Sequence, residues 1–209
     1  MIEHSASVEI QSARLQLRRF TFADAAFFVE LLNDPDWIRF IGDRGVRTED
    51  DARAYMAKTY IAQYERLGYG LYLVQTTVDA TPIGMCGLIK REGLDDVDIG
   101  FAFLPAFRGQ GYALEAATAT LQYGRDVLKL KRVVAIATPD NLSSIALMKK
   151  IGMRFDRTTR LGDDAEELVV YAMAGGSARK IEDTVEIHTN TVVAAKQLCG
   201  ARRVKVSTP

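Results

Sequence analysis

The chain has 209 residues, and 27 Lys and Arg balance 27 Asp and Glu, so its formal net charge is zero. This balance excludes proteins that bind nucleic acid or an anionic membrane surface through a large positive charge. The length suits one domain with an appended segment. Its two cysteines, Cys86 and Cys199, lie outside any Cys/His cluster. We therefore expect a cytoplasmic protein without a metal site, with Cys86 in the core.

The first elements follow from periodicity. Residues 1–11 are expected to form a flexible N-terminus, and alternation of apolar and polar residues predicts a strand at 13–20. Helices are predicted at 21–34 and 48–68, because each segment opens with a Thr and has an Asp three residues later. Later patterns predict strands at 71–78, 82–90 and 97–104, a helix at 111–128, a strand at 132–138, a short helix at 143–152, and strands at 154–161 and 167–173.

This order of elements predicts an α+β domain of three layers. Its sheet is expected to be mixed and mostly antiparallel, with about seven strands and with helices on both faces. The predicted domain covers residues 12–174. Residues 175–209 begin with a Gly-Gly-Ser link and are expected to form a C-terminal extension that contributes packing or an oligomer contact rather than part of a site. We expect a monomer or a homodimer.

A short break before the predicted helix at 111–128 contains the sequence Phe-Arg-Gly-Gln-Gly, residues 107–111. A turn here leaves backbone N–H groups free at the positive end of a helix dipole, which is a binding site for phosphate or pyrophosphate. Gly109 and Gly111 let the backbone approach an anion without a Cβ, and Arg108 adds a positive charge. The alternative is an ordinary turn whose glycines supply a positive φ.

Two common phosphate loops do not match this segment. A P-loop ends in Gly-Lys-Ser/Thr where this chain has Gly-Tyr-Ala, and a dinucleotide fingerprint needs Gly or Ala where Leu114 stands. The pattern Arg/Gln-x-x-Gly-x-Gly/Ala, met by Arg108, Gly111 and Ala113, resembles the acyl-CoA pyrophosphate loop of the GNAT superfamily of N-acetyltransferases. The segment 141–155, Asn-Leu-Ser-Ser-Ile-Ala-Leu-Met-Lys-Lys-Ile-Gly-Met-Arg-Phe, is also similar to that family.

Within the superfamily, the segment Leu-Gln-Leu-Arg-Arg-Phe-Thr-Phe-Ala-Asp-Ala near the start most resembles the branch that acetylates ribosomal-protein N-termini (RimJ/RimL-like). The resemblance implies a GNAT-like acyl-CoA N-acyltransferase fold, acetyl-CoA as co-substrate and no metal. It also implies a set of residues that bind the co-substrate through the central strand, the loop and the following Asn segment. These are Phe101, Phe103, Arg108, Gly109, Gln110, Gly111, Tyr112, Ala113, Asn141 and Ser144.

Three residues are candidates for the chemistry of acetyl transfer. Asp98, at the start of the central strand, is a candidate base for the amine, and its alternative is a solvated charge at a strand end. Glu115 is a second candidate carboxylate, although an acid in the first helical turn also suits the helix dipole. Many relatives place a general-acid Tyr where this chain has Met148. Ser144 is therefore the candidate proton donor to the leaving thiolate, and its alternative is a helix-capping hydroxyl.

The acceptor is expected to be a primary amine, preferably the N-terminal amine of a protein or peptide. Two alternatives remain: a small-molecule amine such as a polyamine, antibiotic or amino acid, and a non-catalytic module that only binds acyl-CoA. The resemblance places the acceptor slot at segments 34–47 and 161–167. Trp37, Phe40 and Tyr69 are candidates to line it, with acidic residues that would suit a cationic acceptor. These acids are Asp34, Asp36, Asp163 and Asp164.

Overall fold

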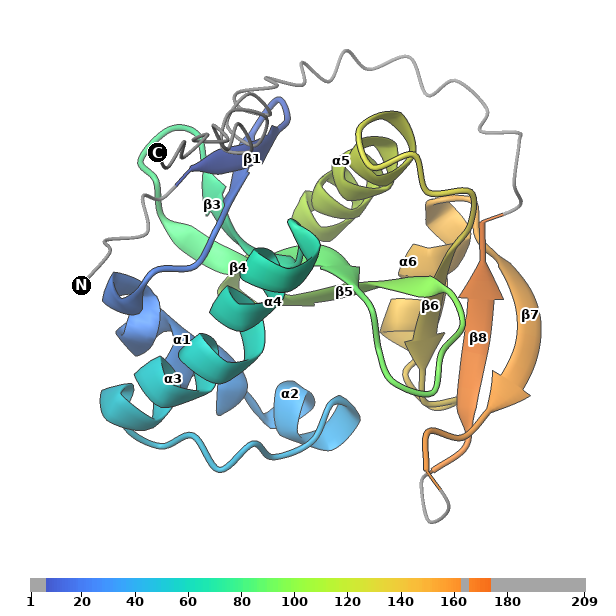
Figure 1. The fold of residues 1–209 in the computed structure, drawn as a ribbon, viewed down its shortest axis with the longest axis horizontal. Coiled ribbons are helices and arrows are strands. Elements are labelled where there is room, and N and C mark those ends of the chain that lie inside the picture. The colour runs from blue at the N-terminus through green and yellow to red at the C-terminus, as the bar shows by residue number, and fades with distance from the viewer. Residues whose placement is uncertain (1–6, 163–165, 174–209) are drawn as a thin grey trace, which may run out of the picture.

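A computed structural model describes residues 7–162 and 166–173. One sheet of eight strands runs through the molecule in the order β1-β2-β3-β4-β5-β6-β8-β7 (Figure 1). All neighbouring strands are antiparallel except β5 and β6, which are parallel. The strands are β1 (Val8–Gln11), β2 (Leu15–Arg18), β3 (Leu71–Thr76), β4 (Pro82–Ile89), β5 (Val97–Phe103), β6 (Val133–Ala137), β7 (Arg154–Thr159) and β8 (Leu168–Ala172).

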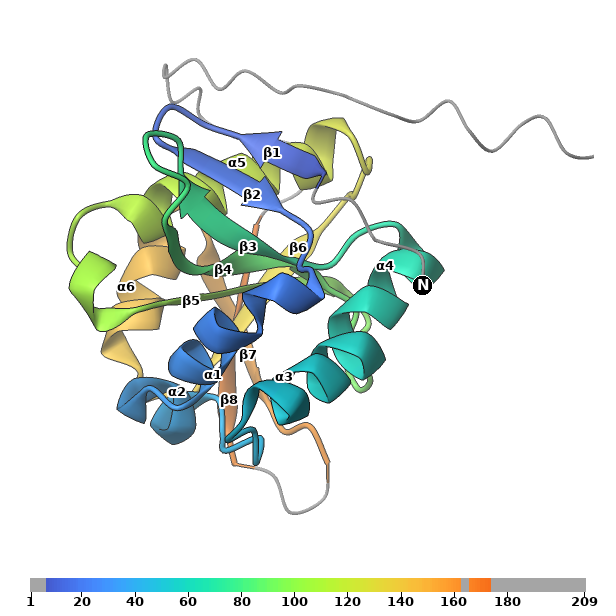
Figure 2. The same ribbon diagram turned by 90° about the vertical axis from the view of Figure 1, so that its left-hand side faces the viewer.

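Helices cover both faces of the sheet. Helices α1 to α4 lie together on one side, and α5 and α6 lie on the other (Figures 1 and 2). The helices are α1 (Ala25–Leu32), α2 (Pro35–Phe40), α3 (Glu49–Met56), α4 (Ala62–Leu67), α5 (Tyr112–Asp126) and α6 (Leu142–Lys150). None of the described helices is long and apolar enough to cross a membrane. The prediction of a mixed sheet between two helical layers is confirmed.

The strand count and the N-terminal boundary differ from the sequence prediction. The sheet has eight strands rather than about seven, because Val8–Gln11, assigned to a flexible N-terminus, forms β1. This strand pairs with β2 through Ile10 and Leu17, and only 1% of Ile10 is exposed. Four residues are too few to show a periodicity, so the burial of one isoleucine was not visible in the sequence.

The predicted N-terminal helices are each interrupted. The segment 21–34 contains a 3-10 turn at Phe22–Asp24 followed by α1, and a separate helix, α2, begins at Pro35. Asp34 caps α2, since its side chain accepts hydrogen bonds from the N–H groups of Asp36 and Trp37. The second predicted helix contains a π-helical turn, Ala57–Ile61, between α3 and α4. Such turns recur at functional sites.

The pairing of β5 differs on its two edges. Along β4 it is paired over six residues, from Ile89 and Asp98 to Gly84 and Phe103. Along β6 it is paired only at Val97 and Asp98, and the two strands then separate. The sheet is therefore open between β5 and β6, at the centre of the molecule.

The predicted core position of Cys86 is confirmed. Cys86 is fully buried on β4, where its sulfur lies 3.4 Å from the Thr120 hydroxyl of α5. Burial raises the pKa of the Cys86 thiol to about 12, so the side chain behaves as a small apolar group. Cys199 lies outside the described residues.

Candidate active site

The loop before α5 has the geometry that its two glycines predict. Gly109 and Gly111 have φ values of +74° and +83°, and Gly111 is the N-cap of the helix. The first helical hydrogen bond runs from Glu115 N to Gly111 O at 3.0 Å, so the N–H groups of Tyr112 and Ala113 precede the helical ladder. A Cβ at Gly109 would meet nothing within 4 Å. The two glycines therefore supply the positive φ of the turn and also leave space beside the free N–H groups. A phosphate group fits this space.

An arginine far away in the sequence holds this loop in place. Arg14 lies between β1 and β2, and its Nη1 donates to the carbonyl of Gln110 at 3.2 Å. Its guanidinium also lies 4.4 Å from the ring centre of Tyr112. Nothing in the sequence pattern pointed to Arg14, because its partners are about a hundred residues away. The strand pair β1-β2 thus positions the loop.

Glu115 is held by hydrogen bonds from the turn between β1 and β2. Its carboxylate accepts hydrogen bonds from Ser12 Oγ at 2.7 Å, from Arg14 N at 2.8 Å and from Arg14 Nε at 2.7 Å. Burial alone would raise the pKa of Glu115, but the hydrogen bonds from Ser12 and Arg14 together lower it. A carboxylate that is held by three donors is a poor base. These contacts favour a structural role for Glu115, and its part in the reaction stays a prediction.

Arg108 is engaged by α2 and by β5. Its Nη2 lies 2.6 Å from Asp34 Oδ1, its Nη1 pairs with Asp36, and its Nε donates to the carbonyl of Phe103 at 2.8 Å. Two carboxylates thus already neutralise the guanidinium. These ion pairs link the loop to α2, and a role for Arg108 in binding a pyrophosphate stays a prediction.

The open edge of β5 presents backbone N–H groups. Leu104 N donates to Ile83 O at 3.0 Å, toward β4. Because successive N–H groups of a strand point to opposite edges, those of Phe101 and Phe103 point to the open edge. The carbonyl of Phe103 on the same edge accepts from Arg108. Phe101 and Phe103 therefore have donors available beside the separation of β5 and β6.

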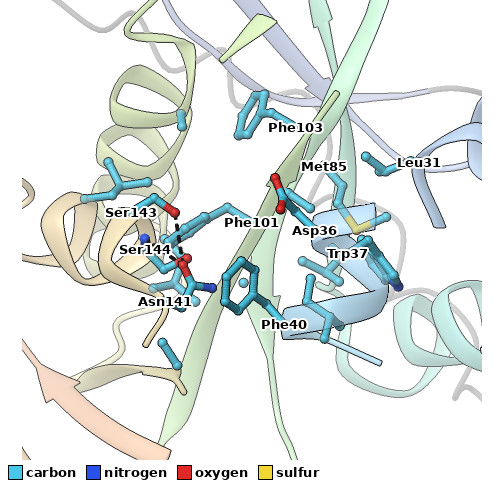
Figure 3. Close-up of a pocket in the computed structure, with 18 of the residues that line it drawn as sticks. Leu31, Asp36, Trp37, Phe40, Met85, Phe101, Phe103, Asn141, Ser143 and Ser144 are labelled. Carbon is cyan, nitrogen blue, oxygen red and sulfur yellow. Dashed lines mark hydrogen bonds between the residues drawn. The ribbon is translucent and has the colours of Figure 1, made fainter. Parts of the chain in front are cut away.

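The start of α6 faces this edge (Figure 3). Asn141 caps the helix, since its Oδ1 accepts from Ser144 N at 3.1 Å and from Ser143 Oγ at 3.0 Å. The capping role that the sequence left open for Ser144 is thus taken by Asn141. Ser144 lines the cavity beside Phe101 (Figure 3), whereas Met148 is buried and is not part of the lining.

One cavity of about 580 Å³ joins these features, within the size range of ligand sites. It extends from the loop and α6 to helices α1, α2 and α3. Its lining includes every predicted co-substrate residue except Gln110, whose side chain donates to the carbonyl of Ala106 at 2.7 Å. Of the predicted acceptor residues, Trp37 and Phe40 line it, as do Asp34 and Asp36. Tyr69 instead packs against the core, and Asp163 and Asp164 lie outside the described residues.

Asp98 lies in the wall of this cavity and is only 1% exposed. Its Oδ2 accepts from Arg91 Nε at 2.9 Å, while its Oδ1 has no partner among the described residues. Burial raises the pKa of the Asp98 carboxyl, and Arg91 opposes this shift only in part. The solvated strand-end alternative is therefore wrong. Its burial and raised pKa are consistent with the prediction that Asp98 is a general base.

Replacement of Glu115 by Ala should affect stability rather than turnover. It removes three hydrogen bonds between α5 and the β1-β2 turn, so we expect the free energy of unfolding to fall by about 1–2 kcal/mol. Thermal melting and turnover at saturating acetyl-CoA measure the two effects. Glu49→Ala, which removes only an exposed ion pair with Arg53, is the control and should leave both values nearly unchanged. A hundredfold loss of turnover at unchanged stability would indicate that Glu115 takes part in the reaction.

Known proteins are similar to this chain in sequence and in fold. Residues 14–154 match the family model described as an acetyltransferase (GNAT) domain. The chain is 35% identical over 147 residues to the uncharacterized N-acetyltransferase YnaD of Bacillus subtilis, which covers 70% of this chain and 83% of YnaD. A solved GNAT-family acetyltransferase from Bacillus anthracis is 32% identical with a TM-score of 0.66, covering 79% of this chain and 97% of that one.

A structure of RimL, the ribosomal L7/L12 α-N-protein acetyltransferase, in complex with coenzyme A shares the fold at a TM-score of 0.69. It is 18% identical, and the match covers 80% of this chain and 98% of RimL. The family model spans more than half of the chain. The chain therefore belongs to the GNAT family of acetyltransferases and is an acyltransferase.

Proposed function

We propose that the chain transfers the acetyl group of acetyl-CoA to the α-amine of a protein or peptide, as a RimJ/RimL-like N-acetyltransferase. One observation carries this proposal. A single cavity is lined by the open edge of β5, the free N-terminus of α5, Ser144 and Asp98. An anion site, carbonyl donors, a hydroxyl and a base are the groups that acetyl transfer to an amine requires.

The donor half of the cavity fits acetyl-CoA, which supplies a thioester carbonyl for attack by the amine. The N–H groups of Gly109 to Ala113 would hold the pyrophosphate, since they are free at the end of a helix of 15 residues. Asn141 would bind the pantetheine arm through the amide nitrogen that helix capping leaves unused. The N–H groups of Phe101 and Phe103 would polarise the thioester carbonyl, because they face the opening between the strands.

Asp98 would take the proton of the acceptor amine through water, because it lies three residues along β5 from Phe101. On β5 the residues alternate between faces, and Asp98 lies opposite Ile89 on the face toward α1 to α4, whereas Phe101 lies opposite Cys86 on the face toward α5. The base therefore belongs to the acceptor side of the sheet. An α-amine has a pKa of about 8, against about 10 for a lysine side chain. The base therefore deprotonates an α-amine more easily.

Ser144 would return a proton to the leaving thiolate. Because Asn141 caps the helix, the Ser144 hydroxyl is not needed for capping. Ser144 lines the cavity from the donor side. The peptide acceptor is supported by the N-terminal resemblance to the ribosomal-protein branch and by the fold shared with RimL.

A charge at Gly111 should abolish acetyl-CoA binding. At a hundredfold excess over its dissociation constant, the co-substrate should stabilise the protein by about 2.7 kcal/mol, a melting increase of roughly 5–10 °C. Gly111→Asp should lose this increase, because it brings a like charge to the loop that binds the pyrophosphate. Gly111→Asn is the matched control, since Asn tolerates the same positive φ without a charge and should retain part of the increase. Equal melting increases in both variants would show that the pyrophosphate does not bind at Gly111.

Replacement of Asp98 by Asn should remove the base while keeping an acceptor for Arg91. We expect kcat/KM to fall by about 100- to 10,000-fold. Because the base must be ionised and its pKa is raised, wild-type kcat/KM should decrease with falling pH at a value above the ordinary Asp range of about 4. Asp96→Asn, which alters an Arg-paired aspartate outside the cavity, is the control. An unchanged rate and pH profile in Asp98→Asn would show that Asp98 is not the base.

Ser144→Ala should lower turnover by about tenfold to a thousandfold and leave acetyl-CoA affinity nearly unchanged. Ser143→Ala is the matched control, because that hydroxyl is bound to Asn141, and it should lower turnover less than about threefold. Free thiol release should be measured with N-terminal peptides, polyamines, aminoglycosides and amino acids. Turnover confined to polyamines or aminoglycosides would contradict the peptide acceptor. An unaffected rate in Ser144→Ala, with chemistry rate-limiting, would contradict the serine's role.

A further inference from the structure

Two arginines line the acceptor half of the cavity at positions that a ligand can reach. Arg44 lies in the loop after α2 and is exposed, and Arg91 follows β4 with 34% of its side chain exposed. Burial raises the pKa of the Tyr60 phenol, and the positive charges of both arginines oppose this shift. Both guanidinium groups therefore act on the same part of the cavity wall.

This part of the cavity has more positive than negative charge. Arg91 is paired with the one carboxylate nearby, Asp98. Arg44 forms no ion pair with a carboxylate of the described residues, and its Nη2 donates only to the carbonyl of Ile41, at 3.1 Å. The other two carboxylates of the lining lie at the start of α2 and are neutralised by the loop arginine, Arg108. The unpaired charge of Arg44 favours an anionic group on the acceptor and disfavours a polycation.

The distance from the opening between β5 and β6 decides where the acceptor carries this group. Arg91 Nε donates to Asp98 Oδ2 at 2.9 Å, and Asp98 lies three residues along β5 from Phe101, which is about 10 Å. In an extended peptide, the side chains of the second and third residues end roughly 7–11 Å from the α-amine. A carboxylate on either residue therefore reaches this part of the cavity while the amine lies at the opening.

We propose that Arg44 selects acceptors with a carboxylate about 10 Å from the reacting amine, which in a peptide means Asp or Glu at the second or third residue. Arg91 adds its charge to the same region but also holds Asp98, so only Arg44 can be changed without disturbing the candidate base. This inference rests on the proposed function and specifies its acceptor.

Steady-state acetylation of peptides that differ only at the second and third residues tests this selection. Peptides with Asp or Glu at these positions should have kcat/KM values about 5- to 50-fold above those with Lys, because the site attracts one charge and repels the other. The difference should lie in KM rather than in kcat, since this contact is the same in the bound substrate and in the transition state. Added salt should reduce it, because the arginines are accessible to solvent.

Arg44→Glu should abolish or reverse the preference for acidic peptides, because it places a carboxylate where the acceptor's carboxylate binds. Arg47→Glu is the matched control. Arg47 lies on the same loop, is exposed, pairs with Asp43 and is outside the cavity lining. This variant should keep the preference within about twofold, since an exposed charge outside the cavity is screened. Thermal melting of both variants establishes that each is folded.

A binding measurement provides a readout that does not depend on turnover. With coenzyme A present, calorimetric titration should give the Asp peptide a dissociation constant at least about fivefold below that of the Lys peptide. Arg44→Glu should remove this difference, and Arg47→Glu should retain it.

The outcomes separate this inference from the proposed function. Equal kcat/KM for Asp and Lys peptides, or equal effects of Arg44→Glu and Arg47→Glu, would overturn the selection by Arg44 while peptide acetylation stands. Acetylation of 8-aminooctanoate, but of neither octylamine nor any peptide, with the same sensitivity to Arg44→Glu, would support the role of Arg44 and contradict the peptide acceptor. Acetylation of polyamines alone would overturn both.

Discussion

The site depends on the loss of pairing between β5 and β6. These parallel strands share only two residue pairs, at Val97 and Asp98, before they separate. Backbone groups left unpaired inside a protein need other partners. Arg108 satisfies the carbonyl of Phe103, and the N–H groups of Phe101 and Phe103 remain for a ligand. The opening also connects the two faces of the sheet, so a donor bound near α5 and α6 can meet an acceptor bound near α1 to α4.

The short helix α2 ties the two halves of the cavity together. Asp34 and Asp36 at its start pair with Arg108 of the loop, and Arg39 near its end pairs with Asp140, which directly precedes Asn141. A six-residue helix has little stability of its own. Its N-cap Asp34, Pro35 in the first turn and these ion pairs fix its position. Trp37 and Ile41 are therefore placed by residues that also position the donor side.

The sequence predicted those features that local chemistry determines. The positive φ of Gly109 and Gly111 and the turn at Asn141 follow from neighbouring residues, as do the sheet and the helical layers. The contacts of Glu115 and Arg108 could not be predicted, because their partners lie far away in the sequence: Arg14 is 101 residues from Glu115, and Asp34 is 74 residues from Arg108. The fold, rather than the neighbouring sequence, determines which groups a charged side chain pairs with. The buried state of Asp98 likewise depends on how β5 packs, and periodicity does not reveal it.

Amide hydrogen exchange at Phe101 and Phe103, with and without acetyl-CoA, tests the central claim most directly. If the donor lies between β5 and β6, both amides should exchange more slowly when it is bound, together with the loop amides of Gly109 to Ala113. Slower exchange in the loop alone, with Phe101 and Phe103 unchanged, would show that the co-substrate does not enter the opening between the strands, and would contradict the account.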